Sequence, residues 1–178
     1  MARRPRLRKR ASSVSLTRKR IQYEERGDEM TRMKRTFGSA TRRQIEEFET
    51  RNGITLPEPY RAFLAETNGG RPLNQEFVVE GWGSSGVSDF YAIGTGNSFD
   101  LDAARDRFLD VLPRDVLAIA SDPGGNQICL GLSADLAGRI LFWGHEDVGR
   151  QLREIAPSFQ NFLNDLKPDG WFDEAAVR

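Results

Sequence analysis

The spacing of apolar residues predicts a helix near the start of the folded part of the chain. Thr41 and Gln44 fit a capping box, in which two side chains satisfy backbone N–H groups at a helix start. Ile45 and Phe48 follow at helical spacing and supply an apolar face. Asn52-Gly53 then ends the helix, because these residue types tolerate the left-handed conformation of a helix end.

A second helix is predicted directly afterwards, from Pro57 onward. Proline is tolerated in a first helical turn, where the backbone N–H has no intrahelical partner. The residues that recur at helical spacing along it are Tyr60, Phe63, Leu64 and Thr67. Asn68-Gly69-Gly70 ends this helix.

Beyond Gly70 the pattern changes to short apolar runs bounded by turn residues, which predict strands. The strands are Gln75–Glu80, Val87–Ile93, Val116–Ala120, Gln127–Leu132 and Arg139–Trp143. Helices are predicted over Ser98–Asp110 and Pro157–Leu166, each with an apolar stripe. Short turns between consecutive strands favour antiparallel pairing. The order predicts a single α+β domain with a mainly antiparallel sheet of about five to six strands, flanked by helices.

Charge is distributed unevenly along the chain, although the formal net charge is zero. Residues 1–35 hold 13 Lys and Arg against 4 Asp and Glu, a charge of +9. The remaining 143 residues hold 13 Lys and Arg against 22 Asp and Glu, a charge of −9. An acidic body can steer association with a basic partner, although solubility alone explains the same charge.

Residues 1–35 lack a sustained apolar period, and we expect them to form a disordered basic tail. Three meanings stay open: an arm that binds nucleic acid or an anionic membrane, a solvated tail without a role, or a segment absent from the native protein. The third meaning rests on Glu24–Glu29, because a nearly pure purine run can encode these residues. A purine-rich run of this kind precedes bacterial start codons. Translation would then begin at Met30 or Met33.

Cysteine content and hydropathy exclude several classes of protein. Cys129 is the only cysteine, so no disulfide forms within the chain, and its apolar surroundings are typical of a small buried residue. The basic N-terminus is not followed by the apolar stretch of a secretory signal, and no apolar run is long enough to span a membrane. We therefore expect a cytoplasmic protein without a membrane partner.

The run Gly81-Trp82-Gly83-Ser84-Ser85-Gly86 matches the glycine spacing of a dinucleotide-binding loop. That loop needs a helix immediately after it, whereas the strand-like run Val87–Tyr91 follows here. We therefore interpret the segment as a flexible loop or a hairpin and expect no cofactor. Trp82 either anchors a partner, as tryptophan does at interfaces, or folds back onto the sheet.

His145 is the only histidine, and it stands beside Glu146. With one distant cysteine it cannot build a standard zinc site, which needs three or four such ligands. Acid–base catalysis by Glu146 with Asp122 stays an alternative, as does a Ser–His–acid or Cys–His arrangement, although carboxylates at turns are ordinarily solvated groups. Cys129 lies in a strand with no cation nearby in sequence to activate it. The sequence therefore predicts no metal site and favours a role that is not enzymatic.

Read in order, several segments of the body resemble the SUKH superfamily, also called the Smi/Knr type. The matching segments are Ile45–Glu49, Leu56–Leu64, Thr67–Gly70, Asp89–Tyr91, Ile119–Asp122, Gly124–Leu132, Gly138–Trp143, His145-Glu146, Ile155-Ala156, Ser158-Phe159 and Phe162-Leu163. Each segment alone is weakly specific, whereas the ordered set is specific to this superfamily.

The resemblance implies an α+β domain over residues 36–168, with 169–178 as a C-terminal extension. In bacteria it implies an immunity protein that covers the toxin domain of a polymorphic or contact-dependent system, and nucleases are prominent among such toxins. Fungal relatives imply an alternative, a regulatory scaffold in cell-wall or signalling networks. Gly144 departs from the family pattern, which has an aspartate between the Trp and His of the last strand, so any role of that carboxylate is in doubt here.

We expect a partner to contact the strand ends, where loops gather. The residues expected to bind it are Trp82, Asp89, Tyr91, Asp122, Asn126, His145 and Glu146. Asp122 and Asn126 are also suited to hold their turn by side-chain to backbone hydrogen bonds. An acidic surface can take the place of nucleic-acid phosphates at a basic toxin cleft. The alternatives are an enzyme, a nucleic-acid-binding module acting through residues 1–35, and a scaffold without a toxin partner.

Overall fold

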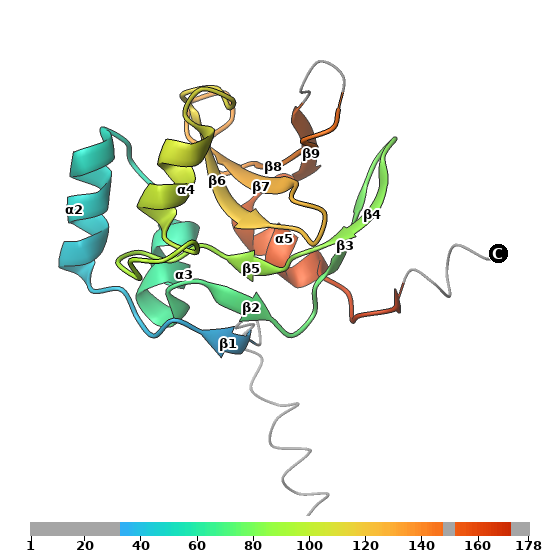
Figure 1. The fold of residues 1–178 in the computed structure, drawn as a ribbon, viewed down its shortest axis with the longest axis horizontal. Coiled ribbons are helices and arrows are strands. Elements are labelled where there is room, and N and C mark those ends of the chain that lie inside the picture. Colours follow the sequence, from blue (N-terminus) through green and yellow to red (C-terminus); the bar gives the residue numbers. More distant parts are fainter. Residues whose placement is uncertain (1–32, 148–151, 172–178) are drawn as a thin grey trace, which may run out of the picture. The chain divides into compact units, whose positions relative to one another are not determined.

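A computed structural model describes residues 33–147 and 152–171 of the chain, and Figure 1 shows their arrangement. The N-terminal tail expected over residues 1–35 lies outside the described residues up to position 32. Its last three residues belong to strand β1, Met33–Thr36. The expected C-terminal extension, 169–178, is described as far as Trp171.

Helix α2, Arg42–Asn52, begins and ends as its sequence predicts. The Thr41 hydroxyl accepts a hydrogen bond from the Gln44 backbone N–H, and the Gln44 side chain accepts one from the Thr41 backbone N–H. These two bonds complete the capping box. Gly53 adopts the left-handed conformation, with φ 61°, directly after the last turn.

Helix α3, Glu58–Thr67, ends at a turn that is hydrogen-bonded to the segment between β5 and α4. Asn68 is left-handed, with φ 44°, and is buried. Its side-chain amide bonds both backbone groups of Ile93, donating to the carbonyl at 3.0 Å and accepting from the N–H at 2.9 Å. A Cβ on Gly70 would lie 2.1 Å from the carbonyl oxygen of Arg35, so only glycine permits this close approach of β1.

Seven strands form one sheet in the order β1-β2-β5-β6-β7-β8-β9, and every neighbouring pair is antiparallel. Beyond β1, the strands are β2 Gly70–Pro72, β5 Asp89–Phe90, β6 Val116–Ser121, β7 Gln127–Gly131, β8 Ile140–Trp143 and β9 Leu152–Ala156. Nearly every residue of β6, β7 and β8 is buried. Such continuous apolar strands occur where both faces of a sheet are covered.

Strands β3, Glu76–Val79, and β4, Gly83–Gly86, form a separate antiparallel hairpin. Phe77 and Val79 are buried, whereas Val78 between them is 53% exposed, because successive strand residues point to opposite faces. The hairpin extends at the right of the sheet in Figure 1.

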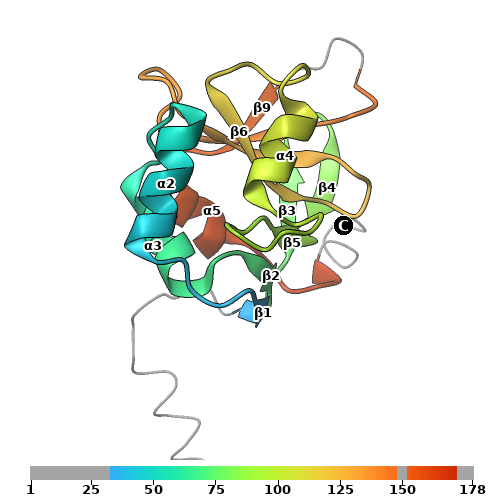
Figure 2. The ribbon, with the colours of Figure 1, turned by 60° about the vertical axis from the view of Figure 1, so that its left-hand side comes forward.

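Helices cover both faces of the seven-stranded sheet. Phe142 and Trp143 are neighbours in β8 and so point to opposite faces. Trp143 contacts Phe108 of helix α4, Leu101–Phe108, whereas Phe142 contacts Phe77 of the hairpin. Helix α5, Phe159–Asp165, lies on the Phe142 face together with α3 and the hairpin. Figure 2 shows α4 set apart from α3 and α5.

The structure confirms the α+β class, the mainly antiparallel sheet and the flanking helices. The sheet has seven strands rather than five to six: the apolar pattern does not predict β1, β2 or β9, and the predicted strand Gln75–Glu80 lies in the separate hairpin as β3. β1 and β9 lie at sheet edges with most residues at least partly exposed, and β2 has only three residues. The glycine-rich segment forms one arm of the hairpin, and β5 is shorter than the strand expected over Val87–Ile93. In the part of the chain that the structure describes, no helix combines the length and apolar character needed to cross a membrane.

Candidate functional site

Asp122 is the centre of a buried hydrogen-bond network at the turn between β6 and β7. Its Oδ1 accepts the backbone N–H of Asn126 at 2.8 Å, and its Oδ2 accepts the side-chain amide of Asn126 at 2.7 Å. Oδ2 also accepts the hydroxyl of Ser85, on β4, at 2.7 Å. The carboxylate therefore holds its own turn, as the sequence predicts, and in addition joins this turn to the β3–β4 hairpin.

Asn126 extends the network to His145. Because Asn126 Nδ2 donates to Asp122, its Oδ1 is the acceptor, and it takes the backbone N–H of His145 at 3.0 Å. The same oxygen lies 2.9 Å from His145 Nδ1. An amide oxygen only accepts, so the neutral imidazole carries its proton on Nδ1. The other ring nitrogen, Nε2, lies 3.8 Å from a carboxylate oxygen of Glu146.

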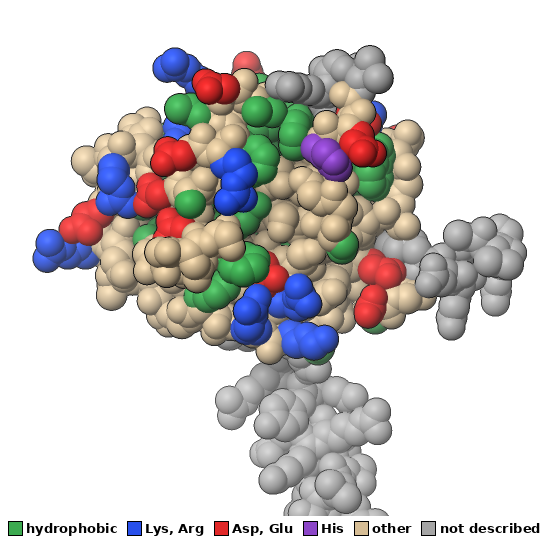
Figure 3. Space-filling view, viewed as in Figure 1, with side chains coloured by type: hydrophobic (Ala, Val, Ile, Leu, Met, Phe, Trp, Pro, Cys, Tyr) green, Lys and Arg blue, Asp and Glu red, His purple; other side chains and the backbone are tan. Residues whose placement is uncertain are grey.

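Three of the predicted residues display their side chains on the surface around this network. Glu146 is 88% exposed, and the single histidine of the protein lies on the surface beside an acidic side chain in Figure 3. Trp82 is 40% exposed, while its ring contacts the buried ring of Phe142 in a tilted arrangement, with 4.7 Å between the ring centroids. Trp82 therefore folds back onto the sheet and keeps part of its aromatic surface exposed, and its role as an anchor for a partner stays a prediction.

The structure places the two other predicted residues, Asp89 and Tyr91, in the interior. Asp89 accepts hydrogen bonds from Arg35 at 2.5 Å and from Arg71 at 3.1 Å. The Tyr91 hydroxyl donates to the side chain of Gln127 at 2.7 Å, and burial raises the pKa of Tyr91. Both side chains are thus occupied with structural partners and lie apart from the exposed surface.

Ser85 and Asp147 belong to this surface although sequence reasoning does not single them out. Asp147 forms an ion pair with Arg153 of β9. A Cβ on Gly144 would lie 2.8 Å from the Asp147 carboxylate, so a carboxylate stands beside position 144 even though residue 144 is glycine. The contact of Ser85 with Asp122 has no local sequence signal, because the two residues are 37 positions apart, whereas the contacts of Asp147 with Gly144 and Arg153 lie within six positions.

In the described part of the chain, His145 is not paired with a nucleophilic side chain. Among the described residues, no hydroxyl or thiol forms a hydrogen bond with His145 Nε2. The Ser85 hydroxyl donates to Asp122, and burial raises the pKa of the Cys129 thiol and keeps it protonated. The described ranges also contain no group of three or more His, Cys, Asp or Glu side chains that could hold a metal ion.

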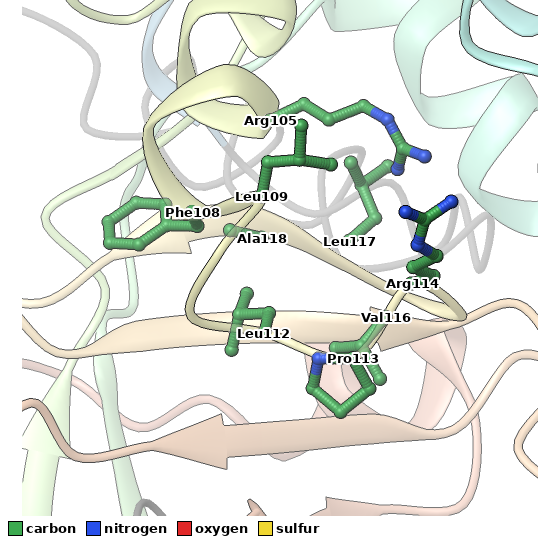
Figure 4. Close-up of a pocket in the computed structure, with 9 residues that line it drawn as sticks. All are labelled: Arg105, Phe108, Leu109, Leu112, Pro113, Arg114, Val116, Leu117 and Ala118. Atoms are coloured by element: carbon green, nitrogen blue, oxygen red, sulfur yellow. The ribbon is translucent and has the colours of Figure 1, made fainter.

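A separate shallow pocket lies between the end of α4 and the start of β6, and Figure 4 shows its lining. Its lining residues are Arg105, Phe108, Leu109, Leu112, Pro113, Arg114, Val116, Leu117 and Ala118. The walls are mostly apolar and carry no carboxylate, hydroxyl, thiol or imidazole. None of the predicted partner-binding residues lines it, so the polar network stays the candidate site.

Comparison with known proteins identifies the family. The chain is 30% identical over 146 residues to the SPbeta prophage-derived uncharacterized protein YokK of Bacillus subtilis (strain 168), and the match covers 71% of this chain and 74% of that protein. The sequence model of the SMI1 / KNR4 family (SUKH-1) matches residues 39–165, which include helices α2 to α5 and the whole polar network. The chain therefore belongs to the SMI1 / KNR4 family (SUKH-1).

Proposed function

We propose that the protein is a cytoplasmic immunity protein that binds the toxin domain of a polymorphic or contact-dependent system and neutralises it by stoichiometric binding. SUKH proteins are known for toxin immunity, and they bind protein toxins. Family membership across residues 39–165 is the observation that carries the proposal.

The network around Asp122 supports a binding role because it orders three segments before a partner arrives. Ser85, Asn126 and His145 come from β4, from the β6–β7 turn and from the segment after β8, and hydrogen bonds join them. A surface that is already ordered loses less conformational entropy on binding. Trp82 supplies an aromatic contact at its margin, the residue type most enriched at interface hot spots.

The acidic charge of this protein supports the proposal that it covers the basic active site of a toxin. Outside residues 1–35 the chain carries a formal charge of −9, and Glu146 beside the network is almost fully exposed. A nuclease binds phosphates through a basic cleft, so an acidic surface speeds association with it and can occupy that cleft. The mechanism is coverage of the toxin site, and it predicts an association rate that falls as salt rises.

The proposal assigns binding rather than turnover to the site. SUKH proteins are generally not enzymes. Asp122 serves acid–base catalysis poorly, since it is buried and both of its oxygens accept hydrogen bonds within the network.

Co-expression with candidate toxin domains, taken first from genes that neighbour its own, tests this function. We expect the protein to restore growth of cells that express the toxin, and the purified pair to elute as one complex of constant stoichiometry in size-exclusion chromatography with light scattering. The double variant Trp82→Ala/Glu146→Lys should protect poorly, whereas Glu66→Lys, an exposed charge reversal on α3, is the matched control. Growth arrest despite a folded protein, together with no complex, contradicts immunity and favours the regulatory scaffold.

A further inference from the structure

Strand β3 already uses one of its two edges. Glu76 exchanges two backbone hydrogen bonds with Lys167, donating to its carbonyl at 3.0 Å and accepting from its N–H at 2.8 Å. The backbone groups of Glu76 therefore point away from β4. The N–H of Gln75 also donates to the carbonyl of Lys167, at 2.9 Å, whereas the carbonyl of Gln75 faces the other arm and accepts the N–H of Val87 at 2.8 Å.

This alternation determines where the backbone groups of β4 point. Ser85 lies opposite Phe77 and directs its N–H and C=O toward β3. Its neighbours Ser84 and Gly86 direct theirs to the open side of the hairpin. Within the described part of the chain, these groups form no hydrogen bond outside the hairpin. Backbone donors and acceptors therefore line a free strand edge.

The free edge of β4 is short, but it lacks two common kinds of edge protection, charged side chains and proline. Natural sheets shield their edges with charged side chains, proline, a bulge or a covering segment. The two edge strands of the large sheet follow this rule, with Lys34 and Arg35 in β1 and Arg153 and Glu154 in β9. Strand β4 reads Gly83-Ser84-Ser85-Gly86 and has neither a charge nor a proline.

The hairpin is nevertheless held firmly in place. Phe77 is buried against the rings of Phe142 and Phe162, and the Trp82 ring rests on Phe142 at the hairpin turn. The Ser85 hydroxyl ties β4 to the buried carboxylate of Asp122. A glycine-rich strand that is ordered in advance can pair with another strand at a low entropic cost.

We propose that β4 is the docking edge for an extended segment of a partner protein, which adds a strand along Ser84–Gly86 and carries basic side chains. Main-chain hydrogen bonds give such strand addition its affinity, and neighbouring side chains give it specificity. The basic character follows from Glu80 at the hairpin turn and from Glu146 in the segment that the network joins to β4, both of which are exposed. The exposed Val78 offers an apolar contact. The inference rests on the proposed protein-binding function and names the surface and the chemistry that function would use.

A phage-displayed library of random dodecapeptides, selected on the full chain, is the probe. We expect selected peptides to be rich in β-branched residues and to contain Lys or Arg. Ser84→Pro should weaken their binding about tenfold, because proline removes an outward N–H while the bonds between β3 and β4 stay intact. Ser84→Ala keeps that N–H and is the matched control, and thermal unfolding shows whether both variants are folded.

Amide hydrogen exchange on the unmutated protein gives a second readout that needs no variant. A bound peptide should slow exchange at Ser84 and Gly86 and leave Ser85, which already faces β3, nearly unchanged. Peptides that bind Ser84→Pro and the unmutated protein equally, or that protect other amides instead, overturn the proposal. Dimers in light scattering that disappear in Ser84→Pro also overturn it, since a second copy would then occupy the edge.

The toxin assay separates this inference from the immunity function. If the unmutated protein and Ser84→Pro neutralise a toxin equally well, β4 is ruled out as the docking edge, whereas the immunity function stands. If peptides bind at β4 but the protein neutralises no toxin, the docking edge is supported and only the immunity function is ruled out.

Discussion

Asp89 and Asp122 are both buried carboxylates at strand ends, yet the structure surrounds them differently. Asp89, on β5, accepts from Arg35 of β1 and Arg71 of β2, whose side chains stay 51% and 42% exposed. Asp122 accepts from neutral donors, chiefly the two N–H groups of the buried Asn126. The first carboxylate fastens an edge of the sheet, and the second shapes the candidate binding surface.

The difference lies in what happens to the donors when the carboxylate is lost. Half-exposed guanidinium groups can turn back to water, so the loss of Asp89 leaves little unsatisfied. The N–H groups of Asn126 are enclosed, so the loss of Asp122 leaves them without a partner, and an unmade hydrogen bond costs most where water cannot replace it. Two residues of one type at similar depth should therefore contribute unequally to stability.

The largest effect is expected for Asp122→Ala, which should lower the free energy of unfolding by about 3 kcal/mol, because several buried donors lose their acceptor. Urea denaturation followed by circular dichroism measures this. Asp135→Ala, at an exposed aspartate in the β7–β8 connection, is the control and should change stability by less than about 0.5 kcal/mol. A loss below about 1 kcal/mol for Asp122→Ala would mean that the network does not hold the turn.

Asp89→Ala should cost less, about 1–2 kcal/mol, because its partners are partly solvated arginines. The cost should shrink in high salt, which screens the two ion pairs, whereas the cost of Asp122→Ala should not. Denaturation of each variant at low and high salt gives the comparison. If the two variants depend equally on salt, the distinction between the arginine partners of Asp89 and the neutral donors of Asp122 does not hold.

Ser85→Ala should cost about 1 kcal/mol and act locally, because it removes one hydrogen bond between the hairpin and Asp122. We expect faster amide exchange in the hairpin and unchanged exchange in β6 to β8, since Phe77 still anchors the hairpin. Ser84→Ala, one residue away and facing outward, is the control. Faster exchange throughout the sheet would show that the network supports the whole fold rather than the surface.

The smallest effect is expected for His145→Ala, at most about 0.5 kcal/mol on unfolding, because the ring is exposed at the end of the network. When the ring is neutral, it should carry its proton on Nδ1, since Asn126 Oδ1 only accepts. Nitrogen chemical shifts of the imidazole measure this tautomer. A ring with its proton on Nε2 would contradict the link between His145 and Asn126.

Local signals in the sequence predict much of this molecule. The ends of α2 follow from Thr41, Gln44 and Gly53, which act on backbone groups within a few positions. The turn of Asp122 and Asn126 is predicted for the same reason, since the two residues are four positions apart. The buried strands β6 to β8 follow from continuous apolar runs, and the ordered resemblance to the SUKH superfamily is confirmed by the family match.

What the tertiary structure decided concerns residues that meet across the fold. The hydrogen bond from Ser85 to Asp122 spans 37 positions, and the bond from Arg35 to Asp89 spans 54. Strand β1 has no apolar alternation, so only its pairing with β2 and the carboxylate of Asp89 place it in the sheet. Sequence alone determined the helices, the turns at their ends and the buried strands β6 to β8, because those choices depend on near neighbours. Packing decided which carboxylate is enclosed by arginines and which supports the surface, because that depends on the strands that come to lie beside it.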